Sequence, residues 1–324
     1  MIKHIIQRIL STILLLLAVS FFTFWLIHAT PGNFFDSLRL NPQISQSTVE
    51  HYEKLYHLND PLLWQYFHWV INIFHGEWGY SLYYNVPVTH VLGSRLFNTF
   101  VLSFTSLILT WGIGIPLGIW AALRRNHWID RMLSVFSFAA FSTPGFFLAV
   151  LVLYAASRWG GLPLGGMHSP NYDDMNLLDK IKDTLLHLVI PAGVLSLSSM
   201  ASLQRIMRGN MLGVLRQQYI LAARAKGLPE GIVIYRHALR NAFNPLVTLL
   251  GYEFAALLSG AALIEIICSW PGLGSLLLTA VRAKDVYLVM SSTLMGGVLL
   301  IMGNVLADIL LTWVDPRIRY EKRR

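Results

Sequence analysis

Three carboxylic acid residues lie within otherwise uncharged apolar stretches of the chain: Glu253, Glu265 and Asp308. A carboxylate in an apolar segment is costly, so it bonds to neighbouring groups or faces a polar path through the segment. Glu253 is nearest the middle of its stretch and is the candidate for lining such a path. Glu265 lies toward one end of its stretch, near the outer interface, and Asp308 lies one turn from Asn304, which favours satisfied packing or an interfacial position over direct contact with a substrate.

The remaining patterns argue against an enzyme. The eleven His residues are scattered, and no H-E-x-x-H motif or His/Asp cluster indicates a catalytic metal. The chain has no G-x-x-x-x-G-K-[ST] loop, so we do not expect it to bind or hydrolyse ATP itself. Cys268 is the single cysteine and cannot form an intramolecular disulfide. No catalytic residue, metal or cofactor is therefore predicted on this chain.

The most informative segment is 204–244, a basic, helix-forming stretch between two apolar blocks. Residues Tyr219–Lys226 are good helix formers, and Gly227 is expected to end that helix. Ile232–Asn241 can form a second helix, with Pro245 opening the next apolar block. Two short helices around a Gly-centred turn make a compact projection that suits docking into a groove on a soluble partner. A purely topological role would explain the charges but not the broken helix pair.

The elements that position these residues are predicted to be membrane helices. Residues of the set AVILMFWYC make up 55% and charged residues 13% of the chain, whereas soluble domains carry about 25% charged residues. A membrane helix needs about 20 mostly apolar residues, and the blocks lack the alternation of barrel strands. Six spans are predicted, the fourth short and rich in Ser: Ile9–Ile27, Phe97–Leu123, Met132–Ser157, Leu188–Leu203, Phe243–Ile267 and Val286–Ala307. The sequence thus predicts an all-α polytopic membrane protein.

Basic residues predict the orientation of these spans. Most of the 25 Lys and Arg fall in the termini and the loops that six spans place on the same side. Both termini are therefore predicted to be cytoplasmic, and the net charge of +8 reflects topology rather than nucleic-acid binding. The first block is predicted to be a retained span, because its apolar core exceeds the 7–15 residues of a signal peptide.

Two further features are open to two interpretations each. In the external region 31–94, the residues Trp64, Phe67, Ile71 and Phe74 fall at helical spacing. They predict either a helix at the membrane interface or a packed helix of an extracellular subdomain.

Small residues and prolines interrupt two spans and favour close helix packing over a substrate path: Gly112, Gly114, Pro116 and Gly118 in the second, and Pro144-Gly145 in the third.

The segment 204–244 strongly resembles the cytoplasmic coupling loop of ABC importer permeases, in particular those of the dipeptide/oligopeptide/nickel branch. The resemblance rests on Ala223-Arg-Ala-Lys-Gly-Leu228, His237-Ala-Leu-Arg-Asn-Ala242 and Pro245. The general family signature is Glu-Ala-Ala, three residues, then Gly. Ala222, Ala223 and Gly227 fit this signature, but Leu221 stands where the signature has Glu, which removes one charged contact.

Motifs in family order extend the resemblance over nearly the whole chain: Ala29-Thr-Pro-Gly32, Leu58-Asn-Asp-Pro-Leu62, Gly76-Glu-Trp-Gly79, Arg95-Leu-Phe-Asn-Thr99, Trp270-Pro-Gly-Leu-Gly274 and Asp315-Pro-Arg-Ile-Arg319. Each is weak alone, and their shared order is the strong signal. The resemblance implies a type I ABC importer permease fold. Its core would span 95–315, after a cytoplasmic end with the first transmembrane helix (1–30) and the external region (31–94), and before a basic cytoplasmic tail (316–324).

The resemblance also implies roles for individual residues. Contacts to the ATPase would come from Tyr219, Ala222, Ala223, Arg224, Ala225, Lys226, Gly227, Leu228, His237, Arg240 and Asn241. Trp270, Pro271 and Gly272 would lie near the translocation path, with a plain turn as the alternative, and Glu253 would join them. The implied partners are a second homologous permease subunit, two ATP-binding-cassette ATPases that hold ATP and Mg, and an extracytoplasmic solute-binding protein, besides membrane lipid.

The implied function is translocation of peptides, nickel or other small solutes across the bacterial cytoplasmic membrane, by alternating access coupled to ATP hydrolysis in partner subunits. Two other classes remain open. A secondary transporter would predict inverted repeats and buried coupling-ion carboxylates, and no repeat is evident. An integral membrane enzyme would need clustered catalytic residues, which the scattered His residues do not supply.

Overall fold

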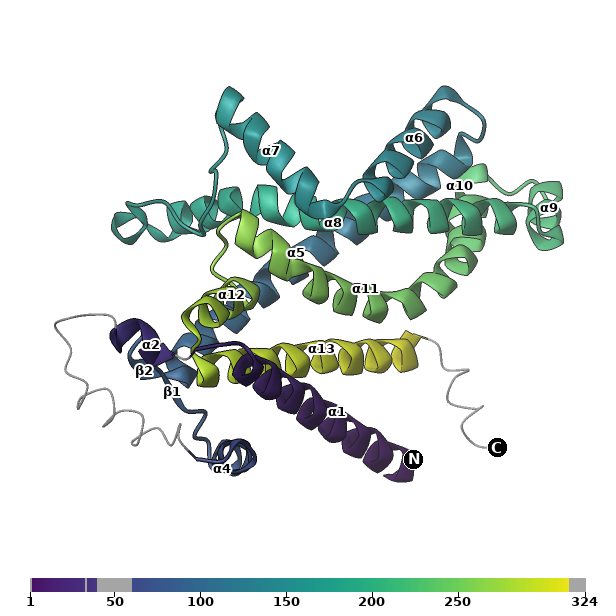
Figure 1. Ribbon diagram of the computed structural model, residues 1–324. Coiled ribbons are helices and arrows are strands. Elements are labelled where there is room, and N and C mark those ends of the chain that lie inside the picture. Colours follow the sequence, from purple (N-terminus) through teal and green to yellow (C-terminus); the bar gives the residue numbers. More distant parts are fainter. Residues whose placement is uncertain (1, 33, 40–59, 315–324) are drawn as a thin grey trace. The chain divides into compact units, whose positions relative to one another are not determined.

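The computed structural model describes residues 2–32, 34–39 and 60–314 (Figure 1). Within them the chain is almost wholly helical, which confirms the all-α prediction, and one small hairpin pairs Tyr80 with Pro87. The elements in chain order are α1 (Ile2–Ala29), α2 (Phe34–Arg39), α4 (Leu62–Phe74), β1 (Tyr80–Ser81), β2 (Val86–Pro87), α5 (Val88–Leu123), α6 (Trp128–Ser142), α7 (Gly145–Trp159), η1 (Tyr172–Asp174), α8 (Leu177–Leu215), α9 (Gln218–Ala225), α10 (Glu230–Ile232), the π-helical η2 (Val233–Ala238), α11 (Leu239–Ile267), α12 (Leu273–Ala283) and α13 (Val286–Val314).

The chain divides into two compact units. The first comprises residues 1–98 and 272–299, and the second comprises residues 99–271 and 300–324. The first unit holds α1, α2, α4, the hairpin and α12, and the second holds α6 to α11. Helices α5 and α13 each contribute residues to both units.

Apolar length identifies the membrane spans. Four stretches are long and apolar enough to cross a membrane: Leu10–Ala29, Val88–Leu123, Leu177–Leu215 and Val286–Val305. Two bent helix pairs pass the same test, α6 with α7 and the two halves of the stretch from Glu230 to Ile267. Counting each bent pair as one span gives six among the described residues, as the sequence predicted. The tail 316–324 lies outside the described residues.

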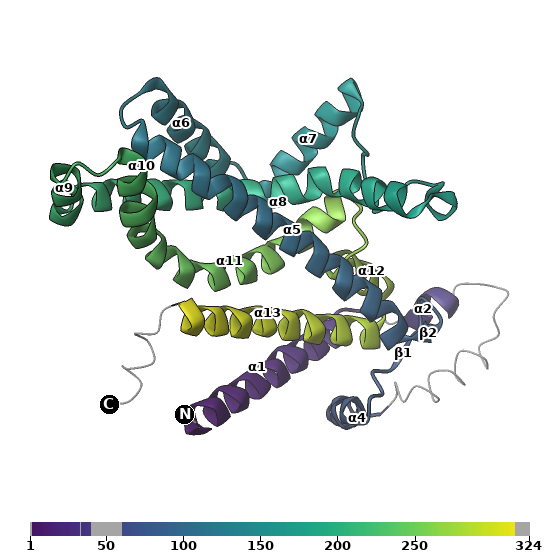
Figure 2. The ribbon, with the colours of Figure 1, turned by 180° about the vertical axis from the view of Figure 1, so that it is seen from behind.

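The third span is broken rather than straight. Helices α6 and α7 meet at an angle of 107°, and Figure 2 shows from behind the V that they form beside α8. Pro144 has no N–H to donate, and its ring forces the preceding residue out of the helical region. Thr143 accordingly has extended φ and ψ angles of −96° and 126°. The proline thus converts one predicted span into two helices of 15 residues each.

The fourth span is much longer than its apolar run predicted. Helix α8 covers 39 residues, and the predicted span 188–203 is only its middle. The helix also continues through the first part of the predicted loop 204–244, and α11 includes its last part, so that the connection between α8 and α11 is 216–238. Pro245, expected to open the fifth span, lies inside α11. The predicted spans were too short because their bounds were set at the nearest charged residues. Charged side chains near a helix end do not stop the backbone hydrogen bonding that continues the helix.

Charged residues extend α8 because α6 supplies partners for them. Asp130 at the start of α6 is 3% exposed and accepts two hydrogen bonds from Arg208, at 2.6 Å from Nε and 2.8 Å from Nη2. The guanidinium of Arg205 lies 5.3 Å from the Phe138 ring centroid and 5.0 Å from that of Phe141, within the range of cation–π attraction. No local pattern predicts these pairings, because the paired residues lie more than 60 positions apart in the sequence.

Glycines let α5 lie directly against α8, as the packing interpretation predicted. Helix α5 runs unbroken through Gly112, Gly114, Pro116 and Gly118. A Cβ atom on Gly118 would lie 2.7 Å from both the Gln204 carbonyl oxygen and the Met207 Cβ atom. Any side chain there would force the helices apart, so Gly118 is a packing residue.

In the first unit, a buried carboxylate anchors the hairpin to α13. Asp285 is fully buried and accepts hydrogen bonds from the Ser81 hydroxyl at 2.7 Å, the Tyr83 amide at 3.0 Å and the Leu288 amide at 3.2 Å. The contacts from Ser81 and Tyr83 join residues about 200 positions apart in the sequence. The three hydrogen bonds satisfy the oxygens of the buried side chain and fix the turn between the strands against the first turn of α13.

The single cysteine is predicted to be unreactive in the folded protein. Cys268 is 2% exposed, and burial raises the pKa of its thiol to about 11, so that the nucleophilic thiolate is scarce near neutral pH. We expect maleimide at pH 7.5 to leave the folded chain unlabelled and to label it fully after denaturation in SDS. Mass spectrometry before and after denaturation measures this. Rapid labelling of the folded chain would show that the Cys268 thiol is accessible to solvent and would contradict its burial.

Candidate coupling site between α8 and α11

The connection between α8 and α11, residues 216–238, is anchored by an apolar core. Ile220 of α9 and Val233 of η2 are fully buried, and both belong to one cluster with Met207 and Met211 of α8. Ala223 is 8% exposed and points into the same cluster. This α8–α11 segment therefore moves with the end of α8 as one packed body rather than as a free loop.

The turn after α9 needs glycine, as predicted. Gly227 has φ +74°, in the left-handed region that glycine adopts at little cost. The Leu228 amide donates to the Ala223 carbonyl at 3.4 Å, and the Gly227 amide donates to the Arg224 carbonyl at 2.9 Å. This pair of bonds is the Schellman pattern that ends helices at a left-handed residue.

An ion pair closes the turn on its exposed side. Arg224 Nη2 donates to Glu230 Oε1 at 2.5 Å and Arg224 Nε donates to Oε2 at 3.2 Å. The hydrogen bond from Arg224 lowers the pKa of Glu230, and the carboxylate raises the pKa of Arg224 in turn. Both side chains are exposed and screened by solvent, so the pair serves mainly to orient the arginine.

The second half of the segment is a π-helical stretch that continues into α11. Six residues, Val233–Ala238, form η2, a rare geometry that often marks functional sites. Tyr235 in its middle is 67% exposed. His237 is half-buried, and Asn241 Nδ2 donates to its carbonyl at 2.8 Å. Arg240 is exposed on the first turn of α11.

The predicted coupling residues thus separate into two groups. Ala223 packs inward and holds the segment together, whereas the others of α9 and its turn are exposed: Tyr219, Ala222, Arg224, Ala225, Lys226, Gly227 and Leu228. By helical spacing, Ala222 and Ala225 lie on the side of α9 opposite Ile220, next to the 54% exposed Leu221. A short helix that presents small and apolar side chains between cations can lie closely against a partner surface.

The predicted path residues lie on α11, at Glu253, and in the link between α11 and α12, at Trp270, Pro271 and Gly272. Trp270 is fully buried in a cluster with Leu102 and Leu188, and its place near the translocation path stays a prediction. Gly272 precedes α12 as its N-cap residue. Glu253 is half-buried on α11, just beyond the 54° bend between Val247 and Tyr252. Its place on the translocation path stays a prediction.

Of the two other predicted intramembrane carboxylic acids, the structure describes the side chain of Glu265 but not that of Asp308. Glu265 is fully buried, and its Oε1 atom accepts a hydrogen bond from the Thr99 hydroxyl at 2.5 Å. This contact supports the packing role predicted for Glu265. Asp308 belongs to α13, but its side chain lies outside the described residues.

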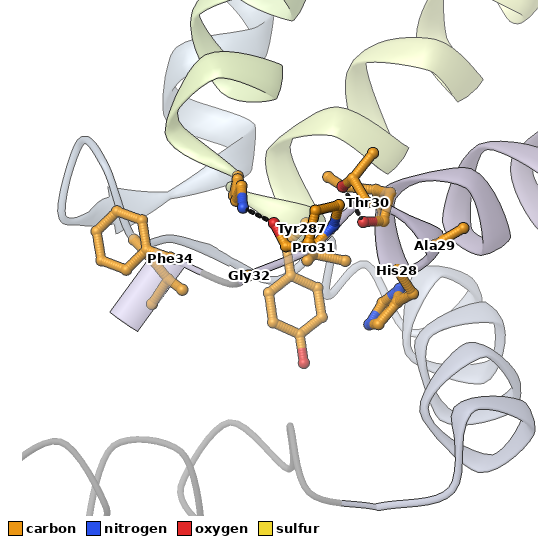
Figure 3. A pocket seen from close by; sticks show the side chains of 11 residues that line it. His28, Ala29, Thr30, Pro31, Gly32, Phe34 and Tyr287 are labelled. Atoms are coloured by element: carbon orange, nitrogen blue, oxygen red, sulfur yellow. Dashed lines mark hydrogen bonds between the residues drawn. The ribbon is translucent and has the colours of Figure 1, made fainter. Parts of the chain in front are cut away.

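A concave site of the first unit lies where α1 ends (Figure 3). This pocket of about 390 Å³ is lined by the residues after Ile27 and by Lys284 and Tyr287. Lys284 Nζ donates to the Pro31 carbonyl, and the Thr30 hydroxyl donates to the Ile27 carbonyl at 2.6 Å. Among the described residues no group of three or more His, Cys, Asp or Glu could hold a metal ion.

Comparison with known proteins identifies the family. Residues 114–320 match the family described as "Binding-protein-dependent transport system inner membrane component", and residues 1–103 match its N-terminal region. The oligopeptide transport system permease protein AppB of Bacillus subtilis is 38% identical over 322 residues, which cover 99% of this chain and 100% of AppB. The glutathione transport system permease protein GsiC of Escherichia coli is 32% identical over 324 residues, with coverage of 99% and 100%.

Solved structures show the same fold. A chain of the MetNI methionine ABC transporter in an inward-facing conformation superposes with a TM-score of 0.56 at 16% identity, covering 70% of this chain and 97% of that chain. A chain of an amino acid ABC transporter gives 0.50 at 18% identity, covering 69% and 94%. The chain therefore belongs to the family of inner membrane components of binding-protein-dependent transport systems, as a multi-pass, non-catalytic permease subunit of an ABC importer that works with an ATPase and a binding protein.

Proposed function

We propose that this chain is one of two related permease subunits of a peptide importer, and that it passes ATP-driven motion into the membrane through the α8–α11 segment. Relatives that match along their whole length are named for oligopeptide, dipeptide and glutathione transport. A peptide backbone with free amino and carboxyl ends is common to these cargoes. Nickel complexes and other small solutes are the remaining candidates, because the solute-binding protein contributes much of the selection.

The observation that carries the proposal is the combination of a rigid base and an exposed surface in one segment. Ile220 and Val233 anchor the segment to α8, while Leu221, Tyr235 and Lys226 are exposed. One ATPase would dock here, and a second on the equivalent segment of the other permease subunit. The exposed residues of the predicted coupling set, together with Leu221 and Tyr235, would make the contact.

The helices that α8 contacts indicate how motion of the α8–α11 segment would pass into the membrane spans. Helix α8 packs against α6, α7 and α11, so a displacement of the segment reaches three neighbours at once. The bidentate Arg208–Asp130 pair ties α8 to the start of α6. We infer alternating access, in which ATP and Mg act within the ATPases, this chain binds no cofactor, and Glu253 lines the path.

The proposed orientation places both termini in the cytoplasm of a bacterial cell. Six spans put the α8–α11 segment, which follows the fourth span, on the same side as the N-terminus. Cations gather in this segment, at Arg216, Arg224, Lys226 and Arg236, as the positive-inside rule predicts for a cytoplasmic loop.

Reconstitution tests the function directly. The tagged chain would be purified from its native membrane with its partners, inserted into liposomes and supplied with its binding protein. We expect uptake of a radiolabelled tripeptide that needs ATP on the α8–α11 side, stops with vanadate and persists when ionophores collapse ion gradients. Uptake driven by an ion gradient without ATP would overturn the proposal in favour of a secondary transporter. ATP-driven uptake of nickel but not of the tripeptide would overturn the peptide assignment alone.

A further inference from the structure

Helix α4 presents a large apolar surface that no described part of the chain covers. One face, with Tyr66 and Trp69, packs in a cluster with Phe24 of α1 and Met290 of α13. The opposite face carries side chains that are 37% to 80% exposed: Leu63, Trp64, Phe67, Ile71 and Phe74. The sequence left open whether such a helix lies at the membrane interface or within an extracellular subdomain.

Contacts with α1 fix the depth of α4 relative to that span. The Tyr66 ring lies 5.3 Å from the Phe21 ring and 5.7 Å from the Phe24 ring, measured between centroids. Phe21 and Phe24 precede the span's end at Ala29 by eight and five residues, which at about 1.5 Å per residue is roughly 12 and 8 Å below that end. The hydrocarbon layer is about 30 Å thick. Helix α4 therefore lies beside α1 at the level of the acyl chains of one leaflet.

The hydroxyl of Tyr66 is the polar group of α4 that lies deepest along the α1 span, and it has hydrogen-bond partners in the protein. The Tyr66 hydroxyl donates to the Leu17 carbonyl at 2.9 Å and lies 2.9 Å from the Ser20 hydroxyl. Both partners lie near the middle of the α1 span, where no water is available. These hydrogen bonds offset the cost of removing the hydroxyl from water, so the contact fits a membrane-embedded position.

The chemistry of the exposed face favours lipid over another helix. Membrane helix interfaces are rich in small residues that let backbones approach, as Gly118 does between α5 and α8. The exposed face of α4 has only large apolar side chains, with Phe67, Ile71 and Phe74 in a row at helical spacing. At about 100° per residue, His68 and Asn72 form a polar edge beside this row. One packed face, one apolar face and one polar edge suit a helix lying at the boundary between acyl chains and headgroups.

We propose that α4 is an interfacial helix whose exposed apolar face binds the acyl chains of the leaflet at the C-terminal end of α1. It anchors the region between the first and second spans to the bilayer. The apolar surface of α1 continues this lipid-facing belt, since Phe22 and Leu26 are 66% and 62% exposed. The inference holds whatever solute the importer carries, so it stands or falls independently of the peptide assignment.

Spin labels at single positions test the surface in the complete complex in liposomes. Cysteine would be introduced by Phe67→Cys and Phe74→Cys on the apolar face, and by Glu77→Cys in the exposed loop after α4 as the matched control. Buried Cys268 is expected to stay unlabelled. We expect oxygen, which concentrates in the acyl chains, to raise the spin-relaxation rate of labels at positions 67 and 74 more than a water-soluble nickel chelate does. The label at position 77 should show the reverse.

Two outcomes would overturn the proposal. Labels at 67 and 74 that respond mainly to the nickel chelate would place α4 in water, within an external subdomain. Labels that respond to neither reagent would show that the second permease subunit or the binding protein covers this face. A variant that fails to assemble is replaced by its neighbour on the same face, Phe67→Cys by Leu63→Cys, so that each comparison is made on assembled complexes.

Discussion

Replacing Gly227 by valine is expected to lower solute-stimulated ATP hydrolysis and uptake about ten-fold, while membrane insertion stays normal. Gly227 has φ +74°, and a β-branched residue in that region costs about 1–2 kcal/mol or more. The chain would leave the Schellman turn, and the exposed face of α9 would no longer be held against the ATPase. ATP hydrolysis with and without binding protein and solute, measured in proteoliposomes, reports the effect.

The matched control is Gly227→Asn, because asparagine tolerates left-handed backbone angles better than other side chains. No atom lies within 4 Å of a Cβ built on Gly227, so neither variant creates a clash within the chain. We expect Gly227→Asn to retain most of the coupling and deletion of residues 223–228 to abolish it. Normal coupling in the valine variant would refute the docking assignment. Equal loss in both variants would show that side-chain bulk at the interface, and not the turn, is responsible.

Replacing Asp130 by alanine is expected to destabilise the second unit by about 3 kcal/mol and to abolish uptake, because it leaves Arg208 without its partner. The Asp130 side chain is 4% exposed and that of Arg208 is 28% exposed, so the estimate lies at the lower end of the range for buried pairs. A lower midpoint of thermal unfolding for the purified complex would measure the loss. The same contact ties α8 to α6, so coupling should fail even below the unfolding temperature.

Two variants separate charge from geometry in this pair. The double replacement Asp130→Leu with Arg208→Met removes both charges and should recover most of the stability, since apolar residues of similar size often replace buried pairs without cost. Arg208→Lys keeps the charge but loses the planar fork that makes two parallel bonds, so an intermediate result is expected. An unchanged unfolding midpoint in Asp130→Ala would show that the pair contributes nothing measurable.

Local patterns were enough to predict the helical projection at the coupling site. Gly227 ends α9 as predicted, because the signal for a glycine-capped helix lies within a few neighbouring residues. The inward direction of Ala223 could have been found from its spacing to Ile220, three residues earlier. The role of Asp130 could not, since its partner Arg208 is 78 residues away. Pairing over such a distance leaves no local pattern.

The sequence by itself determined how many apolar segments cross the membrane and where the glycine-broken projection lies. Both follow from the transfer of side chains and backbone groups between water and hydrocarbon, which depends on composition over one helix length. Only the tertiary structure decided how far the third span bends and where the fourth span ends. Pro144 marks the break in the sequence, but its angle of 107° is a property of how α6 and α7 pack, and α8 reaches Leu215 because α6 supplies a partner for Arg208. It also decided that Trp270 packs in the core and that α4 packs beside α1, since burial and packing are properties of contacts between distant segments.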